Sequence, residues 1–224
     1  MRAKYNCNIP WVILLDPTSA CNLHCTGCWA AEYGNRLNLS LSEIDSIIRQ
    51  GKELGVYMYI YTGGEPMVRS ADLITLCERH PDCQFLTFTN ATLIDEKLAD
   101  DMLRVKNLIP AISLEGFEAA TDGRRGDGVY QKVLRAMSLL RQKRLPFGIS
   151  ACYTSQNLDS ISSDEFIDQP SDGTAKLTAY SYAVLCWPPA PCFAVSRHCG
   201  ARVQSQSPPV HPMSPIPAAL ALSG

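Results

Sequence analysis

Residues 40–66 read SLSEIDSIIRQGKELGVYMYIYTGGEP, which places a helix, a strand and a polar loop in succession. Ser40 and Glu43 form a capping-box pattern, in which two side chains satisfy the first free amides of a helix. Apolar residues then recur on one helical face as far as Gly55, a residue that suits the position after a helix end. Val56–Tyr61 is β-branched and aromatic, as expected of a strand. The stretch therefore predicts one helix–strand unit that ends in the loop TGGEP.

The same alternation runs through the first three quarters of the chain. It implies parallel strands joined by right-handed crossovers, hence an α/β sheet or barrel. In either architecture the chemistry lies at the carboxyl ends of the strands. Strands are predicted over residues 11–15, 56–61, 85–89, 109–114 and 147–153, and helices over 41–54, 70–79, 129–144, 164–168 and from 95 onward.

The composition is that of an ordinary globular protein. The 224 residues carry 20 Lys+Arg and 22 Asp+Glu, a net charge of -2, and the mean hydropathy is -0.05. Without a net positive field, a polybasic nucleic-acid binder is excluded. No run approaches the roughly 20 apolar residues of a membrane helix. We therefore expect a soluble cytoplasmic protein with no nucleic-acid or membrane partner.

Three of the ten cysteines, Cys21, Cys25 and Cys28, follow the first predicted strand with the spacing C-x3-C-x2-C. Three close thiols cannot all pair as disulfides. A structural zinc site would need His24 as a fourth ligand, but His24 abuts Cys25 and chelation by both neighbours is awkward. Three thiolates at this spacing suit three irons of a [4Fe–4S] cluster and leave its fourth iron open. The pattern therefore favours a metal cofactor with a free coordination position.

This triplet, together with TGGEP at the end of the next strand, resembles the signature of radical S-adenosylmethionine (SAM) enzymes. The resemblance covers residues 11 to about 168 and implies a partial (β/α)6 TIM-like barrel that is incomplete at its C-terminus. It also implies a [4Fe–4S] cluster, bound SAM and an electron donor such as flavodoxin or ferredoxin. In such enzymes reductive cleavage of SAM yields a 5′-deoxyadenosyl radical, which abstracts hydrogen from the substrate. The chain is thus expected to be an oxidoreductase whose substrate, peptide or small molecule, is unknown.

The resemblance also implies where SAM would bind. Gly63 and Gly64 lack a Cβ and so allow backbone to approach a ligand. Glu65 would offer acceptors to the SAM ammonium group, with Pro66 completing the motif. The remaining expected contacts are Asn90, which would orient the sugar or the neighbouring loop, Ser113, Arg125 as the partner of the SAM carboxylate, and the backbone of residues 148–150 near the adenine.

Several other residues are interpreted without a function. Glu115 stands where the family segment carries aspartate, and it keeps the charge on a longer side chain. Cys7, Cys77, Cys83 and Cys152 show no ligand spacing, and Cys77 and Cys152 are expected to be buried thiols. His80 is expected at the surface, and Arg124 is expected to be a solvated charge.

The composition changes near residue 169. Residues 170–224 contain one acid and nine prolines, and the alternation of strands and helices stops there. We therefore expect a domain over residues 1–168 and a tail over 169–224 that arises from truncation or a shifted reading frame. A barrel without its sixth strand leaves the fifth with an unpaired edge, which predicts poor solubility or lost activity. Cys186, Cys192 and Cys199 in the tail have no assigned ligand.

Two alternatives to an active radical SAM enzyme stay open at this point. The first is a structural or interaction module in which the three cysteines hold zinc. The second is a truncated relative that keeps the fold but has lost turnover.

Overall fold

The computed structural model of the chain describes residues 8–34, 36–152 and 154–167. They form a five-stranded sheet in the order β1-β2-β3-β4-β5, in which every neighbouring pair is parallel. The expected tail over 169–224, with its three cysteines, lies outside the described residues. The strands are β1 (Ile13–Thr18), β2 (Met58–Gly63), β3 (Gln84–Thr89), β4 (Leu108–Ser113) and β5 (Gly148–Ser150).

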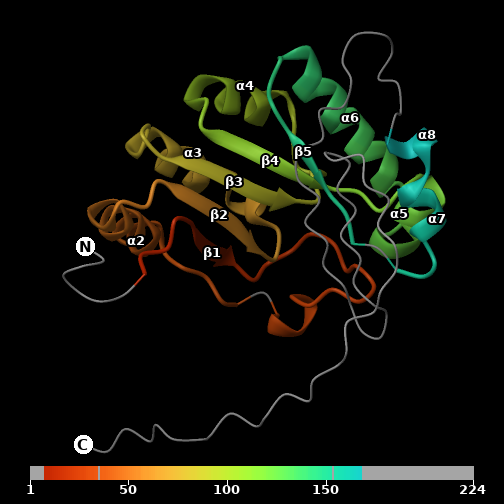
Figure 1. Cartoon of the computed structure of the whole chain (residues 1–224), viewed down its shortest axis with the longest axis horizontal. Coiled ribbons are helices and arrows are strands. Elements are labelled where there is room, and N and C mark those ends of the chain that lie inside the picture. Colours follow the sequence, from red (N-terminus) through yellow and green to blue (C-terminus); the bar gives the residue numbers. More distant parts are fainter. Residues whose placement is uncertain (1–7, 35, 153, 168–224) are drawn as a thin grey trace, which may run out of the picture.

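Helices follow the strands as the alternating pattern predicts, and the large ones cover one face of the sheet (Figure 1). The order of strands matches their order in the sequence, which is the topology of a barrel wall. The prediction of an α/β fold with an incomplete barrel is confirmed. The helices are α2 (Leu41–Leu54), α3 (Ser70–Arg79), α4 (Glu96–Val105), α5 (Glu118–Arg125), α6 (Val129–Gln142), α7 (Leu158–Ser162) and α8 (Asp164–Ile167), with short 3-10 turns η1 (Ala31–Tyr33) and η2 (Pro66–Arg69).

The core lies between the sheet and these helices. Tyr59 and Tyr61 of β2 are fully buried and their rings stack with Phe85 of β3. From α2, Ile44 and Ile48 are fully buried in the same cluster. The predicted capping box is present, with Ser40 Oγ accepting from the Glu43 amide at 3.2 Å and the Glu43 carboxylate accepting from the Ser40 amide at 2.7 Å. The sequence pattern thus fixes both the start of α2 and the face that it buries.

Some boundaries differ from the sequence predictions. Trp11 is 76% exposed and precedes β1, which begins at Ile13 and reaches Thr18 through an irregularity after Leu15. Helix α5 was not predicted, because only Thr121 of its side chains is buried and the segment has no apolar stripe. Leu54, the last of the apolar residues that recur before Gly55, is exposed at the end of α2.

Two further predictions about the core need correction or support. His80 was expected at the surface, but its side chain is buried and its Nε2 lies 3.1 Å from Asp45 Oδ1. Cys77 is a buried thiol, as predicted, and Cys83 is buried too, whereas Cys7 lies outside the described residues. Among the described residues, no helix has the length and apolar character needed to cross a membrane.

Candidate functional site

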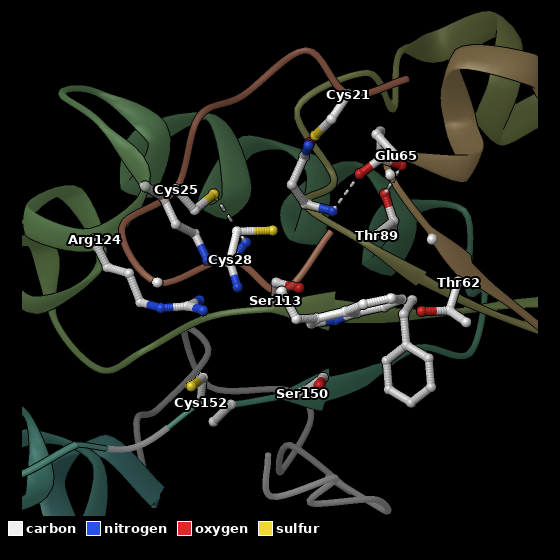
Figure 2. Close-up of a pocket in the computed structure, with 18 of the residues that line it drawn as sticks. Cys21, Cys25, Cys28, Thr62, Glu65, Thr89, Ser113, Arg124, Ser150 and Cys152 are labelled. Carbon is white, nitrogen blue, oxygen red and sulfur yellow. Dashed lines mark hydrogen bonds between the residues drawn. The ribbon is translucent and has the colours of Figure 1, made fainter. Parts of the chain in front are cut away.

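A cavity of about 410 Å3 lies at the carboxyl ends of the strands (Figure 2). Residues 19–37, which follow β1 and carry the three cysteines, fold over these strand ends and are called the cysteine loop below. The cavity brings together all three predicted cysteines and the predicted residues Gly63, Gly64, Glu65, Asn90, Ser113 and Arg125. Of residues 148–150 only Ser150 lines it, and Pro66 is buried at the start of η2. The alternation of strands and helices is what places these residues together, because the ends of parallel strands share one edge of the sheet. The lining comprises Leu14, Cys21, Cys25, Gly27, Cys28, Trp29, Thr62, Gly63, Gly64, Glu65, Phe88, Thr89, Asn90, Ser113, Arg124, Arg125, Ser150, Ala151 and Cys152.

The cysteine loop leaves β1 and returns to its own starting point. The Ser19 amide donates to Leu37 O at 2.8 Å, and the Leu37 amide donates to Ser19 Oγ at 3.0 Å. Within the loop the three cysteine side chains are half-buried and line the same cavity. Burial raises the pKa of the Cys21 and Cys25 thiols, and nearby Arg125 opposes that rise at Cys25. The loop therefore presents three thiols to one cavity.

The glycine pair after β2 packs against the backbone that leads into this loop. A Cβ on Gly64 would lie 2.2 Å from Ala20 O, and one on Gly63 would lie 2.7 Å from Thr18 O. Gly63 also has a φ of 99°, a backbone conformation that favours glycine. The two glycines were expected to allow the close approach of a ligand. In the structure both line the cavity, but the contact that demands glycine is with the protein's own backbone.

Glu65 is buried and its carboxylate ties β2 to β3. Oε1 accepts from Thr89 Oγ1 at 2.7 Å and from the Met67 amide at 2.9 Å, while Oε2 accepts from the Asn90 amide at 2.7 Å. Burial raises the pKa of Glu65, and these hydrogen bonds oppose the rise by favouring the charged form. The carboxylate therefore holds two neighbouring strand ends in register beside the cavity.

Asn90 connects the end of β3 to the cysteine loop. Its Nδ2 donates to Asn22 Oδ1 at 2.8 Å, and its Oδ1 accepts from the amide and the hydroxyl of Thr92. Asn22 also donates to Thr92 Oγ1 at 2.8 Å. Since Asn22 directly follows Cys21, this network fixes the first cysteine relative to the sheet. Of the two roles predicted for Asn90, orientation of the neighbouring loop matches these contacts.

The ends of β4 and β5 form the opposite wall of the cavity. Figure 2 shows Ser150 and Cys152 on the side away from the cysteine loop, with Ser113 between them and Cys28. The Leu114 amide donates to Ser150 O at 3.0 Å and keeps the two strand ends together. Cys152 was expected to be a buried thiol, but it is half-buried and lines the cavity. Its position just beyond the end of a strand could have identified Cys152 as a cavity residue from the sequence.

Arg125 meets a carboxylate of the protein itself. Glu115 is fully buried and accepts from Arg125 Nε and, at 2.7 Å, from Arg125 Nη2. Arg124 also donates to Glu115, through Nη1 at 2.9 Å. Burial acts to lower the pKa of Arg125, but the hydrogen bond and charge of Glu115 outweigh it, so that pKa lies above its usual value. The expectation that Arg124 is solvated is wrong, because it lines the cavity as the second partner of Glu115.

Among the described residues, no group of three or more His, Cys, Asp or Glu side chains is arranged to hold a single metal ion.

Comparison with known proteins finds relatives for the same part of the chain. An uncharacterized protein of Methanocaldococcus jannaschii is 27% identical over 167 residues, covering 69% of this chain and 56% of that protein. An AdoMet-dependent heme synthase of Methanosarcina barkeri is 27% identical over 160 residues, covering 69% of this chain and 46% of the synthase. The chain thus spans about half the length of the curated relatives that it matches.

A solved structure extends this likeness to the fold. The crystal structure of Streptococcus suis SuiB bound to the precursor peptide SuiA matches with a TM-score of 0.62 at 25% identity, covering 71% of this chain and 37% of SuiB. The family model described as "Radical SAM superfamily" matches residues 15–163, from β1 to the end of α7. That match takes in more than half of the chain and every strand that lines the cavity, so the chain belongs to the radical SAM superfamily.

Proposed function

We propose that the chain is a radical SAM enzyme that holds a [4Fe–4S] cluster through Cys21, Cys25 and Cys28. The observation that carries the proposal is that all three thiols line one cavity together with the loop TGGEP from the next strand. The donor set fits the cofactor, since thiolates are the protein ligands of such clusters and three of them leave one iron open. When bound, the cluster and SAM supply the electron transfer and the 5′-deoxyadenosyl radical.

The protein's own residues would bind and orient SAM and exclude water. We assign the SAM contacts to Gly63, Gly64, Glu65, Asn90, Ser113 and Arg125, with Pro66 fixing the turn after Glu65. Oε2 of Glu65 accepts one hydrogen bond, from Asn90, and a carboxylate oxygen has capacity for a second. That capacity, on the cavity side of β2, supports its assignment to the SAM ammonium group.

The adenine would lie against the other wall. We assign it to the backbone of β5, where Ser150 lines the cavity, in agreement with the family position of residues 148–150. Trp29 also lines the cavity and its ring packs edge-on against Tyr33, with centroids 5.8 Å apart. This pair would supply an aromatic surface that the position before Cys28, a glycine, lacks.

The substrate class follows only from the relatives. One relative is named a heme synthase, which points to a small molecule, and SuiB was crystallised with a bound precursor peptide. We propose a substrate of one of these two classes, a flavodoxin or ferredoxin as electron donor, and a cytoplasmic location. Hydrogen abstraction makes the proposed enzyme an oxidoreductase.

The experiment that tests the function is anaerobic reconstitution with iron and sulfide, followed by an assay of 5′-deoxyadenosine from SAM under reduction. We expect a brown protein that releases 5′-deoxyadenosine, and loss of both properties in Cys28→Ala. Cys83→Ala is the matched control, because it removes a buried thiol outside the cavity and is expected to keep both.

The two alternatives give different results in the same experiment. A colourless protein with one zinc per chain would identify the structural module and defeat the proposal. A brown protein that releases no 5′-deoxyadenosine would identify a relative that has lost turnover.

A further inference from the structure

Glu115 is a fully buried carboxylate two residues beyond the end of β4. Its two oxygens accept three hydrogen bonds from Arg124 and Arg125. A buried charge is stable only when it is paired and hydrogen-bonded, and this one is paired twice. The group therefore combines one negative and two positive charges behind the cysteine loop.

Arg125 is held by this carboxylate in one orientation. Nε and Nη2 of its planar guanidinium both donate to Glu115, which leaves Nη1 on the other edge of the fork. Nη1 lies 3.9 Å from the Sγ atom of Cys25, in range for a hydrogen bond to sulfur. The Arg125 guanidinium thus contacts the Glu115 carboxylate with one edge and the Cys25 thiol with the other.

A second contact joins the same helix end to the loop. The Thr26 amide donates to Arg124 O at 2.8 Å, directly beside Cys25. The Arg124 side chain donates to Glu115 but makes no hydrogen bond to a cysteine among the described residues. The two arginines therefore carry equal charge at nearly the same place, and only Arg125 contacts sulfur.

We propose that Glu115 positions Arg125 so that its guanidinium donates to the Cys25 sulfur, and that this contact raises the reduction potential of the cluster. The inference rests on the proposed function, because it needs the cluster at Cys25. Reduction adds negative charge to a cluster and its thiolates, so a cationic donor against one sulfur stabilises the reduced form more than the oxidised form. Glu115 is a positioning residue in this scheme, since it acts through Arg125.

The test is the midpoint potential of the cluster, measured by electron paramagnetic resonance on reconstituted protein without SAM. Omitting SAM separates this role from any contact of Arg125 with the SAM carboxylate. In Arg125→Gln we expect the ratio of reduced to oxidised cluster at a fixed potential to fall about tenfold, or ~59 mV for one electron. Arg124→Gln is the matched control, because it removes the same charge without removing a contact to sulfur, and its fall should be clearly smaller.

The role of Glu115 is tested by Glu115→Asp, which keeps the charge but withdraws the carboxylate from Arg125. We expect this variant to lower the potential in the same direction as Arg125→Gln. In the Arg125→Gln background the same change should have no further effect, which a double-mutant cycle measures. Iron content and circular dichroism of each variant show whether the fold and the cluster are retained.

Three results would overturn the inference. Equal shifts of the midpoint potential in Arg125→Gln and Arg124→Gln would mean that only the charge matters and not the contact with sulfur. No shift of the potential in either variant would mean that the arginines do not affect it. An additive effect of Glu115→Asp would show that Glu115 does not act through Arg125. Each of these results requires a cluster in the wild-type protein, whereas a wild-type protein without any cluster would refute the proposed function itself.

Discussion

Gly64→Ala is expected to disrupt the junction between the loop TGGEP and the cysteine loop. The new Cβ would lie 2.2 Å from Ala20 O, 2.6 Å from Ser19 O and 2.7 Å from Ala20 C. All three are backbone atoms, so a change of side-chain rotamer cannot relieve the contact. The segment that leads to Cys21 has to move.

The energetic cost follows from what that movement breaks. Two backbone hydrogen bonds join these segments, from the Gly64 amide to Thr18 O at 2.9 Å and from the Glu65 amide to Ala20 O at 2.8 Å. Each is worth about 0.5–1.5 kcal/mol, and overpacking of a tight site costs roughly 1–3 kcal/mol. We therefore expect the free energy of unfolding to fall by about 2–6 kcal/mol, and the iron bound per chain to fall as Cys21 is displaced.

The assay is anaerobic urea unfolding of the cluster-free protein, followed by circular dichroism and extrapolated to water. Gly123→Ala is the control, because Gly123 is exposed in α5 and a Cβ there meets nothing within 4 Å. Alanine is favoured over glycine in a helix by about 1 kcal/mol, so this variant should be as stable as wild type or slightly more stable. A Gly64→Ala protein within about 0.5 kcal/mol of wild type would refute the packing argument.

Asn107→Ala should lower the free energy of unfolding by about 2–4 kcal/mol, because the two N–H groups on Nδ2 of this buried residue are shared among the backbone oxygens of Cys77, His80 and Cys83, each 3.1 Å away. An unchanged urea midpoint would contradict this. Burial raises the pKa of Cys77 to about 12 and that of Cys83 to about 11, so iodoacetamide should modify both far more slowly in the folded protein than in urea, and equal rates by mass spectrometry would count against their burial. Because the folded thiols keep their protons longer than unfolded ones, stability should also fall as the pH rises from about 9 toward those values, and a flat profile would speak against the raised pKa values. Cys25→Ala should lose the brown colour, since three thiolates are the minimum for the cluster, and a variant with full iron content would argue for another ligand.

The fold and most of the site could be predicted because their signals are local. The capping box joins Ser40 to Glu43, three residues away, and the apolar face of α2 repeats every three or four residues. The three cysteines and the loop TGGEP each follow a predicted strand, and parallel strands bring such loops to one edge. Helix α5 lacked such a signal, because it is polar and buries one side chain.

The contacts that were missed join residues distant in sequence. Asn22 and Asn90 are 68 positions apart, and Arg125 and Cys25 are 100 apart, so neither pairing leaves a pattern in a local window. Arg124 was placed in solvent because charge is usually exposed, and His80 because it ends a helix just before Pro81. Each instead meets a buried or half-buried carboxylate from another part of the chain. The demand for glycine at Gly64 likewise comes from Ala20, across the junction of two loops.

The central claim is that Cys21, Cys25 and Cys28 hold a cluster with one open iron that binds SAM. The most direct measurement is the electron paramagnetic resonance spectrum of the reduced, reconstituted protein with and without SAM. We predict a [4Fe–4S] signal in the absence of SAM and a changed signal when SAM is added, because SAM then occupies the open iron. A cluster signal that SAM does not alter, or a protein that binds zinc and gives no signal, would contradict the account.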